Sequence, residues 1–204
     1  ANALADQYDS VWSTMPNRTI SEPDVAAGFD QNELLIDVDE AIALLLSVEP
    51  KKAAGPDGLP GILFKKCATS IGPAFAVLIN RSLRESRVPV AWKQSLICPV
   101  PKKGDLSKCL NWRPVNLLNI SAKLAEKHIS SKTSTYIMPR LSKLQFGFMP
   151  KRGTEDAVLY VDHSVRCKMR KSGHRKGTAT MVSIDVSKAF DTVPFGKLLS
   201  CLRD

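Results

Sequence analysis

The chain has 204 residues, of which 44% are hydrophobic and 24% charged, and its formal net charge is +9. This composition excludes a disordered chain, and the length allows one domain or a domain and a half. No apolar run approaches the roughly 18 residues of a membrane span, so we expect no membrane partner. Five cysteines without a C-x-x-C pair argue against a zinc site and favour free thiols inside the cell.

Charge divides the chain into two parts. Residues 1–49 contain ten acids and one base, a net charge of −9, whereas residues 50–204 carry +18. The basic part predicts a polyanionic partner, most simply nucleic acid, with a basic surface kept for solubility as the alternative. The acidic opening at 1–36 is typical of a connector, with a helix around Asn2–Trp12.

After the acidic opening, the sequence first predicts two helices. One begins after Asp37, which caps it together with Glu40, and ends before Pro50. A-A-G-P-D-G-L (53–59) then forms a turn, and a second helix spans about Gly72–Glu85. The apolar residues expected to face the core are Val38, Ile42, Leu45, Val48, Phe75, Leu78, Ile79 and Leu83.

Strand signals follow. W-K-Q-S-L-I-C-P-V-P (92–101) predicts a strand, K-K-G-D (102–105) a turn, and R-P-V-N-L-L (113–118) the antiparallel partner. The prolines in these segments favour strand ends or the edge of a sheet.

The rest of the chain alternates helix, loop and strand. A helix is expected from Ser121 towards Leu141, a loop over 145–153, and a strand at Ala179–Val186. Thr154 is expected to cap a helix whose inward residues are Ala157, Val158, Val161, Val165 and Met169. These elements together predict an α+β fold with a mixed or antiparallel sheet.

The last predicted strand ends on an acid. In S-I-D-V-S-K-A-F-D-T-V (183–193), Asp185 is either a turn-forming residue or a metal ligand, and this stretch alone favours the turn. Nucleotidyl transfer uses two divalent ions held by carboxylates and carbonyls, so Asp185 and the carbonyl of Val186 are candidate ligands.

Five motifs occur in one order along the chain. They are K-A-A-G-P-D-G-L, P-V-P-K-K-G-D, N-W-R-P-V-N-L-L followed by K-L-A-E-K, Q-F-G-F-M-P-K-R-G-T-E-D-A, and S-I-D-V-S-K-A-F-D-T-V. From about Asp37 to the C-terminus this series resembles the reverse transcriptases of non-LTR (LINE-type) retrotransposons, and more distantly those of group II introns. The opening A-N-A-L-A-D-Q-Y-D-S-V-W is similar to the segment that joins endonuclease to polymerase in such elements.

The resemblance implies part of a right-hand polymerase. Residues 1–36 would be the connector, 37–178 the fingers and the fingers–palm junction, and 179–204 the first palm strand with the following helix. The implied activity is RNA-directed DNA polymerisation with an RNA template, a DNA primer and deoxynucleoside triphosphates. The implied cofactor is Mg²⁺ or Mn²⁺, and the implied location is the nucleus or a cytoplasmic ribonucleoprotein.

Site residues also follow from the resemblance. Asp185 matches the first catalytic aspartate and, with Val186, a metal ligand, while Asp191 supports the motif. Phe190 matches the residue under the incoming sugar, where its ring would exclude a 2′-hydroxyl, with a core aromatic as the alternative.

Basic residues in the five ordered motifs match the nucleotide-binding residues of the family. Arg113 and either Lys102 or Lys103 match the residues that hold the triphosphate, with a solvated hairpin turn as the alternative for the lysines. The segment that lies near template in the family contains Gln145, Phe148, Lys151, Arg152 and Gly153. A buried aromatic loop followed by a capped helix is the alternative for that segment.

The family pattern continues with a glycine-containing motif and a paired aspartate, which are not found in this sequence. We therefore expect the chain to be a piece of a longer polymerase, inactive and poorly stable by itself. A catalytically dead nucleic-acid-binding remnant is the alternative function, and an unrelated Mg²⁺ phosphohydrolase is a third.

Overall fold

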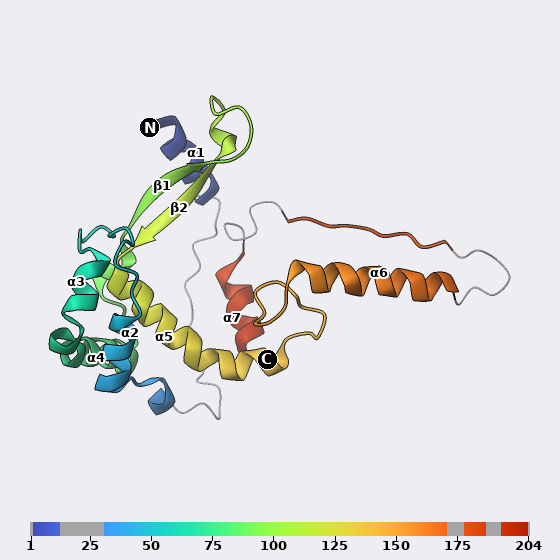
Figure 1. Ribbon diagram of the computed structural model, residues 1–204. Coiled ribbons are helices and arrows are strands. Elements are labelled where there is room, and N and C mark those ends of the chain that lie inside the picture. Colours follow the sequence, from blue (N-terminus) through green and yellow to red (C-terminus); the bar gives the residue numbers. More distant parts are fainter. Residues whose placement is uncertain (1, 13–30, 171–177, 187–192, 204) are drawn as a thin grey trace. The chain divides into compact units, whose positions relative to one another are not determined.

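The computed structural model describes residues 2–12, 31–170, 178–186 and 193–203. The chain divides into two compact units, a first unit of Ala1–Ser134 with Phe190–Asp204 and a second unit of Thr135–Ala189. Helices predominate, and the described residues contain one sheet of two antiparallel strands (Figure 1). The predicted α+β class is therefore confirmed.

The first unit begins with the predicted helix and ends with another. Its elements are α1 (Asn2–Trp12), η1 (Gln31–Leu34), α2 (Val38–Leu46), α3 (Gly61–Lys66), α4 (Ala68–Arg84), η2 (Val90–Lys93), β1 (Ser95–Pro101), η3 (Cys109–Asn111), β2 (Trp112–Leu118), most of α5 (Ile120–Ile137), and α7 (Phe195–Arg203). In the second unit η4 (Met138–Arg140) follows the end of α5, and a loop leads to α6 (Thr154–Arg170).

Helix α2 begins as the sequence predicts. The Asp37 carboxylate accepts a hydrogen bond from the backbone N–H of Glu40 at 2.7 Å, which satisfies one of the free donors of the first turn. The Glu40 side chain does not complete the reciprocal box that the sequence suggests, because its carboxylate pairs with Lys132 of α5 at 2.9 Å. The cap thus fixes the start of α2, and the ion pair joins it to α5.

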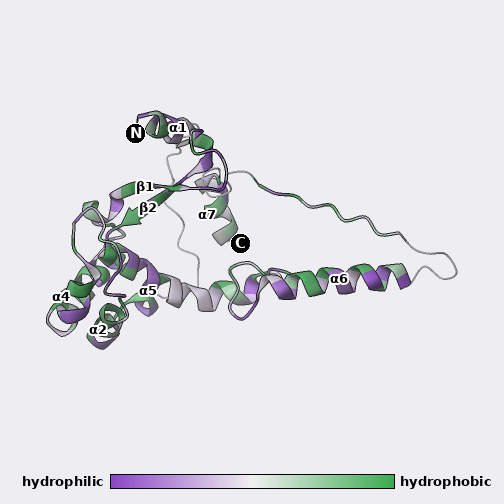
Figure 2. Cartoon of the chain, turned by 45° about the horizontal axis from the view of Figure 1, so that its top comes forward, coloured by the Kyte–Doolittle hydropathy of each residue, from purple (hydrophilic) through white to green (hydrophobic). Residues whose placement is uncertain are grey.

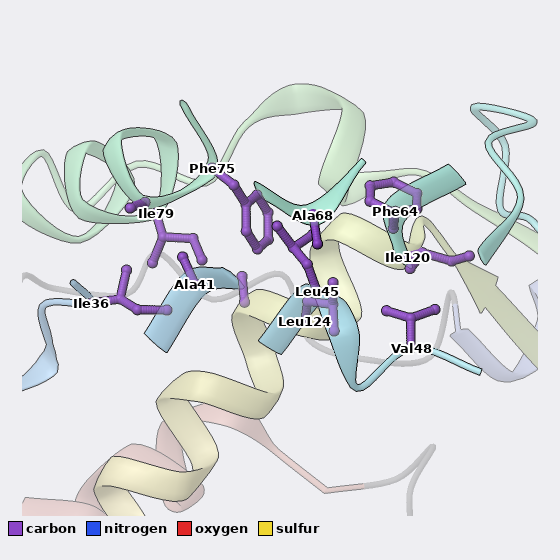
Figure 3. Packing of buried hydrophobic residues seen from close by; sticks show 12 residues of the cluster. Ile36, Ala41, Leu45, Val48, Phe64, Ala68, Phe75, Ile79, Ile120 and Leu124 are labelled. Atoms are coloured by element: carbon purple, nitrogen blue, oxygen red, sulfur yellow. The ribbon is translucent and has the colours of Figure 1, made fainter. Parts of the chain in front are cut away.

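The core of the first unit lies where α2, α3, α4 and α5 meet (Figure 3). Leu45 of α2 and Ile79 of α4 are almost completely buried, and Phe64 of α3 and Leu124 of α5 pack into the same cluster. Val38 and Leu78 were predicted to face this core but are exposed by 43% and 39%. Sequence periodicity identified the helices here but misjudged the edge of each buried face.

Helix α4 starts earlier than predicted. It begins at Ala68 rather than at Gly72 and continues through Pro73, although proline removes one intrahelical donor. Ala68 and Gly72 are both buried, and a side chain at Gly72 would collide with Ile42 of α2. The two helices therefore pack closely where α4 passes through Pro73.

Asn80 ties α4 to the chain before α2. Its side-chain amide donates to the carbonyl of Ile36 at 2.8 Å and accepts from the N–H of the same residue at 2.9 Å. A buried backbone unit next to a helix start needs such partners. One side chain therefore satisfies both polar groups of Ile36, which is 3% exposed.

The predicted hairpin is confirmed. Strands β1 and β2 pair antiparallel with Val100 opposite Arg113 and Pro99 opposite Pro114, and Trp92 belongs to η2 instead of the strand. Beyond the strands, the N–H of Lys102 donates to the carbonyl of Asn111 at 2.7 Å and continues the ladder by one pair.

Helix α6 differs from the sequence-based prediction in its burial. Figure 2 shows hydrophobic and hydrophilic residues along α6, but none of its described side chains is buried. Val158, Val161 and Met169, predicted to point inward, are exposed by 66%, 41% and 47%. An apolar stripe is buried only if another layer covers it, and the described residues of the second unit do not supply one.

The predicted strand Ala179–Val186 is not formed. Residues 178–186 have no regular secondary structure, and nothing among the described residues pairs with them. A strand is defined by hydrogen bonds to a neighbour, so an apolar alternating sequence without one stays irregular. Its side chains are exposed, with Ile184 at 86%.

All five cysteines are free thiols, as expected. Among the described helices, none combines the length and apolar character required to cross a membrane.

Candidate functional site

The hairpin carries the residues predicted to hold a triphosphate. Paired residues in an antiparallel ladder share a face, and successive pairs alternate. Arg113 is paired with Val100, so the continuation of the ladder at Lys102 and Asn111 lies on the same face as Arg113. The register therefore favours Lys102 over Lys103 as the partner of Arg113, although the function of both lysines stays a prediction.

The Lys102 ammonium already has a protein partner. Its Nζ donates to the carbonyl of Leu110 at 2.9 Å, across the loop that joins the strands. Lys103 and Arg113 are exposed to solvent. The alternative reading, a solvated hairpin turn, therefore fits Lys103 better than Lys102.

The hairpin loop is held by its own side chains. The Asn111 amide donates to the carbonyl of Asp105 at 2.7 Å, and the Trp112 indole N–H donates to the carbonyl of Leu106 at 3.0 Å. The Ser107 hydroxyl and backbone N–H donate to the Asp105 carboxylate and lower the pKa of Asp105. Local hydrogen bonds thus hold the loop beside Lys102.

The turn at Gly55–Gly58 is held by a residue that sequence reasoning missed. The N–H of Gly58 donates to the carbonyl of Gly55 at 3.0 Å, which confirms the predicted turn. Asn119, 2% exposed, accepts from the N–H of Asp57 at 3.1 Å and donates to the carbonyl of Ala91 at 2.9 Å. Asn119 therefore ties the turn to the junction of β2 and α5.

Asn119 also occupies the position before the first residue of α5, where its carbonyl accepts from the N–H of Lys123 at 3.1 Å. Asparagine between a strand and a helix is a recognisable cap signal. The helix begins at Ile120, one residue before the expected Ser121, and the cap signal accounts for this start. The signal does not predict that the Asn119 side chain contacts a turn about 60 residues away.

The loop before α6 contains the residues predicted to contact template. Nη1 of Arg152 donates to the carbonyls of Lys143 and Gln145 at 2.8 and 2.7 Å, and its guanidinium carbon lies 5.8 Å from the centre of the Phe146 ring. The Gln145 side-chain amide donates to the carbonyl of Gly147 at 2.9 Å. Two of the five predicted template residues, Gln145 and Arg152, thus take part in the structure of the loop itself.

Phe148 has a different environment. Phe148 is 91% exposed, which contradicts the alternative of a buried aromatic for this residue. Phe148 and Lys151 adopt left-handed backbone angles, with φ of 60° and 59°, and such angles are uncommon for residues other than glycine.

The start of α6 is capped differently from the prediction. The Gly153 carbonyl accepts from the N–H of Ala157, so Gly153 rather than Thr154 occupies the cap position. The Asp156 carboxylate accepts from the N–H of Gly153 at 2.7 Å. The N–H of Gly153, one of the residues predicted to lie near template, therefore already donates to a carboxylate of the protein.

Lys151 offers a test of this loop. Replacing Lys151 with isoleucine is expected to destabilise the second unit by about 1–2 kcal/mol, because a β-branched side chain is strained at positive φ. Glycine should change stability by no more than about 0.5 kcal/mol, since relief of strain offsets the greater freedom of the unfolded chain. Hydrogen exchange of the α6 amides measures both effects, and equal losses for the two variants would contradict the assignment of strain.

The candidate metal ligands lie at the end of the second unit. Asp185 and Val186 are exposed, whereas Phe190 and Asp191 lie outside the described residues. The described part of the chain contains no group of three or more His, Cys, Asp or Glu side chains that could hold a metal ion. Asp185 has the chemistry that Mg²⁺ requires, but the described residues do not by themselves form a metal site.

Comparison with known proteins identifies relatives along most of the chain. A transposon TX1 protein of 149 kDa from Xenopus laevis is 27% identical over 198 residues, which cover 97% of this chain and 14% of the relative. A 115 kDa protein of the type-1 retrotransposable element R1DM from Drosophila melanogaster is 29% identical over 172 residues, covering 83% and 16%. A Pol polyprotein of the element R2 from Popillia japonica is 27% identical over 125 residues, covering 61% and 17%. The chain thus spans 14% to 17% of the length of these curated relatives.

A family model matches as well. The model described as "Reverse transcriptase (RNA-dependent DNA polymerase)" matches residues 100–204, which include the hairpin lysines, the Arg152 loop and the segment around Asp185. Together with the relatives, this match confirms the resemblance to non-LTR retrotransposon proteins that the ordered motifs predict. The chain belongs to the reverse transcriptase family.

Proposed function

We propose that the chain is the fingers and the beginning of the palm of an RNA-directed DNA polymerase from a non-LTR retrotransposon. Reverse transcriptases in general use divalent metal ions and act on RNA templates and nucleotides. The observation that carries the proposal is the family match over residues 100–204, together with relatives from retrotransposable elements. We propose an RNA template, a DNA primer and deoxynucleoside triphosphates as its partners.

The hairpin is the proposed triphosphate site. Arg113 has a planar fork of donors that matches phosphate oxygens, and Lys102 or Lys103 adds a point charge. The register supports a joint role for Lys102 and Arg113, because both lie on one face. The hydrogen-bonded loop beside them supports a hairpin tip that is ordered before nucleotide binds.

The loop before α6 is the proposed template site, with Gln145, Phe148, Lys151, Arg152 and Gly153. Asp185 and the carbonyl of Val186 are the proposed ligands of Mg²⁺ or Mn²⁺, with the remaining ligands coming from outside the described residues. Phe190 is the proposed selector of the deoxyribose. We propose that the protein works in the nucleus or in a cytoplasmic ribonucleoprotein, where template RNA is available.

Binding of an RNA–DNA template–primer tests the nucleic-acid part of the proposal. The charge of +18 on residues 50–204 predicts that log K falls linearly with log salt, by about 0.7–0.9 for each phosphate contacted. Fluorescence anisotropy with a labelled hybrid, and heparin as competitor, measures the slope and the preference for nucleic acid. Heparin displacing the hybrid at equal charge concentration would instead support a basic surface without a nucleic-acid site.

Primer extension by the chain alone belongs to the same series of experiments. The sequence-based expectation is that no template-directed incorporation occurs. Incorporation that follows the template sequence would show that expectation to be wrong and would strengthen the proposed activity.

A further inference from the structure

One side chain closes the loop between η4 and α6. Both hydrogens of Arg152 Nη1 are directed to backbone carbonyls, those of Lys143 and Gln145, which precede Arg152 by nine and seven residues. A flexible loop is expensive to close, and a single guanidinium that joins both of its ends reduces the number of open conformations. Arg152 therefore holds the beginning of the loop against its end.

The closed loop is anchored to α6. The face of the Arg152 guanidinium lies over the Phe146 ring, and Phe146 in turn packs against Tyr160 of α6 with ring centres 5.9 Å apart and a tilt of 45°. The Asp156 carboxylate holds the N–H of Gly153 at the first turn of the same helix. Both the aromatic and the capping contacts fix the orientation of the loop on α6.

The anchored loop presents an aromatic ring to solvent. Phe148 lies in the part of the loop that Arg152 closes, between Gln145 and Arg152. The residue is 91% exposed, and its backbone has a φ of 60°. An exposed phenylalanine on a left-handed backbone is unfavourable for folding on both counts. Strain of this kind, kept in place by surrounding contacts, is characteristic of binding sites.

We propose that Arg152 is a positioning residue that holds the 142–153 loop so that the ring of Phe148 stacks on an unpaired base of the bound strand. This deepens the template role proposed above and rests on it, but it changes the role of Arg152 from direct contact with template to support of the loop. An aromatic face stacks on any base, so the contact suits a polymerase that copies every template sequence. The two carbonyls engage Nη1, so the phosphate fork formed by Nη1 and Nη2 is not open to the bound strand.

Hydrogen exchange tests the loop closure without any nucleic acid. In Arg152→Met we expect the amides of residues 143–149 to exchange at least about tenfold faster, because the loop opens more often. Arg152→Lys should behave almost like methionine, since an ammonium has no planar face to cover Phe146. Arg170→Met, at the other end of α6, removes the same charge and should leave the loop unchanged. Unchanged exchange in Arg152→Met would overturn the positioning role.

Binding of a single-stranded RNA oligonucleotide tests the stacking. Phe148→Ala and Arg152→Met are each expected to weaken binding about tenfold, and the double variant no further, because both remove one contact. The slope of log K against log salt should stay that of the parent chain. A slope reduced by about 0.7 in Arg152→Met, with recovery in Arg152→Lys, would show a direct phosphate contact and overturn the proposal.

The two parts of the experiment separate the possible failures. A parent chain that binds no RNA would overturn the proposed function and the stacking, while hydrogen exchange still decides whether Arg152 closes the loop. Phe148→Tyr should retain the affinity of the parent chain because it keeps the aromatic face. Loss of affinity in Phe148→Tyr equal to that in Phe148→Ala would overturn stacking by the ring.

Discussion

Gly55→Ala is expected to destabilise the first unit by about 3 kcal/mol. A β-carbon at this position would lie 2.6 Å from the backbone nitrogen, the α-carbon and the side-chain oxygen of Asn119. Real β-carbons do not approach backbone atoms so closely, and the turn must move away. That movement breaks the hydrogen bond from Asp57 to Asn119, so a buried amide loses its partner in addition to the steric strain.

Gly58 provides a matched control in the same turn. A β-carbon there meets nothing within 4 Å, so the effect of Gly58→Ala comes only from its φ of 67° and should be about 1 kcal/mol. Urea unfolding followed by tryptophan fluorescence reports on the first unit, because the three tryptophans of the chain lie within residues 1–134. Equal effects of the two substitutions would show that contact with Asn119 does not hold the turn.

Asp185→Asn is expected to reduce template-directed incorporation by about 10³-fold or more in a reverse transcriptase that includes this chain. The amide keeps the size of the carboxylate but removes the negative charge that a divalent ion requires. Primer extension on an RNA template measures the loss. Asp185 is exposed and lies in a segment without regular structure, so the substitution should change stability by less than about 0.5 kcal/mol.

Asp162→Asn is the control for this substitution. Asp162 is also an acid of the second unit, and it pairs on the surface of α6 with Arg166 at 2.7 Å. Exposed pairs of this kind contribute little, so activity should stay within about twofold of the parent enzyme. If Asp185→Asn kept the activity of the control, the proposed metal role of Asp185 would have to be abandoned.

Local signals predicted the parts of the fold that local physics determines. The cap at Asp37, the hairpin pairing and the turn at Gly55–Gly58 each follow from a few neighbouring residues, and the structure confirms them. Burial of a face depends on which other element covers it, and a short sequence pattern does not contain that information. For this reason the apolar stripe of α6 was wrongly predicted to point inward, and Ala179–Val186 was wrongly predicted to form a strand.

In the candidate site too, contacts between residues close in sequence were predictable and contacts between distant residues were not. The ordered motifs predicted that Arg113 and either Lys102 or Lys103 hold the triphosphate, and the register places Lys102 on the same face as Arg113. Asn119 was missed because its partners, Asp57 and Ala91, are distant in sequence. The motif predicted that Arg152 lies near template, but it does not specify the path of the loop, on which the contacts of Arg152 with two carbonyls depend.

The prolines of the hairpin have a consequence for the association of the protein with other chains. Because the N–H of Lys102 points to the partner strand, alternation makes the nitrogens of Pro99, Pro101 and Pro114 point outward. These prolines therefore remove no hydrogen bond from the ladder between the two strands. Each of them does remove one N–H donor from the outer edge of its strand. An incoming strand finds no continuous row of hydrogen-bond groups on either side, which protects the hairpin against edge-to-edge aggregation.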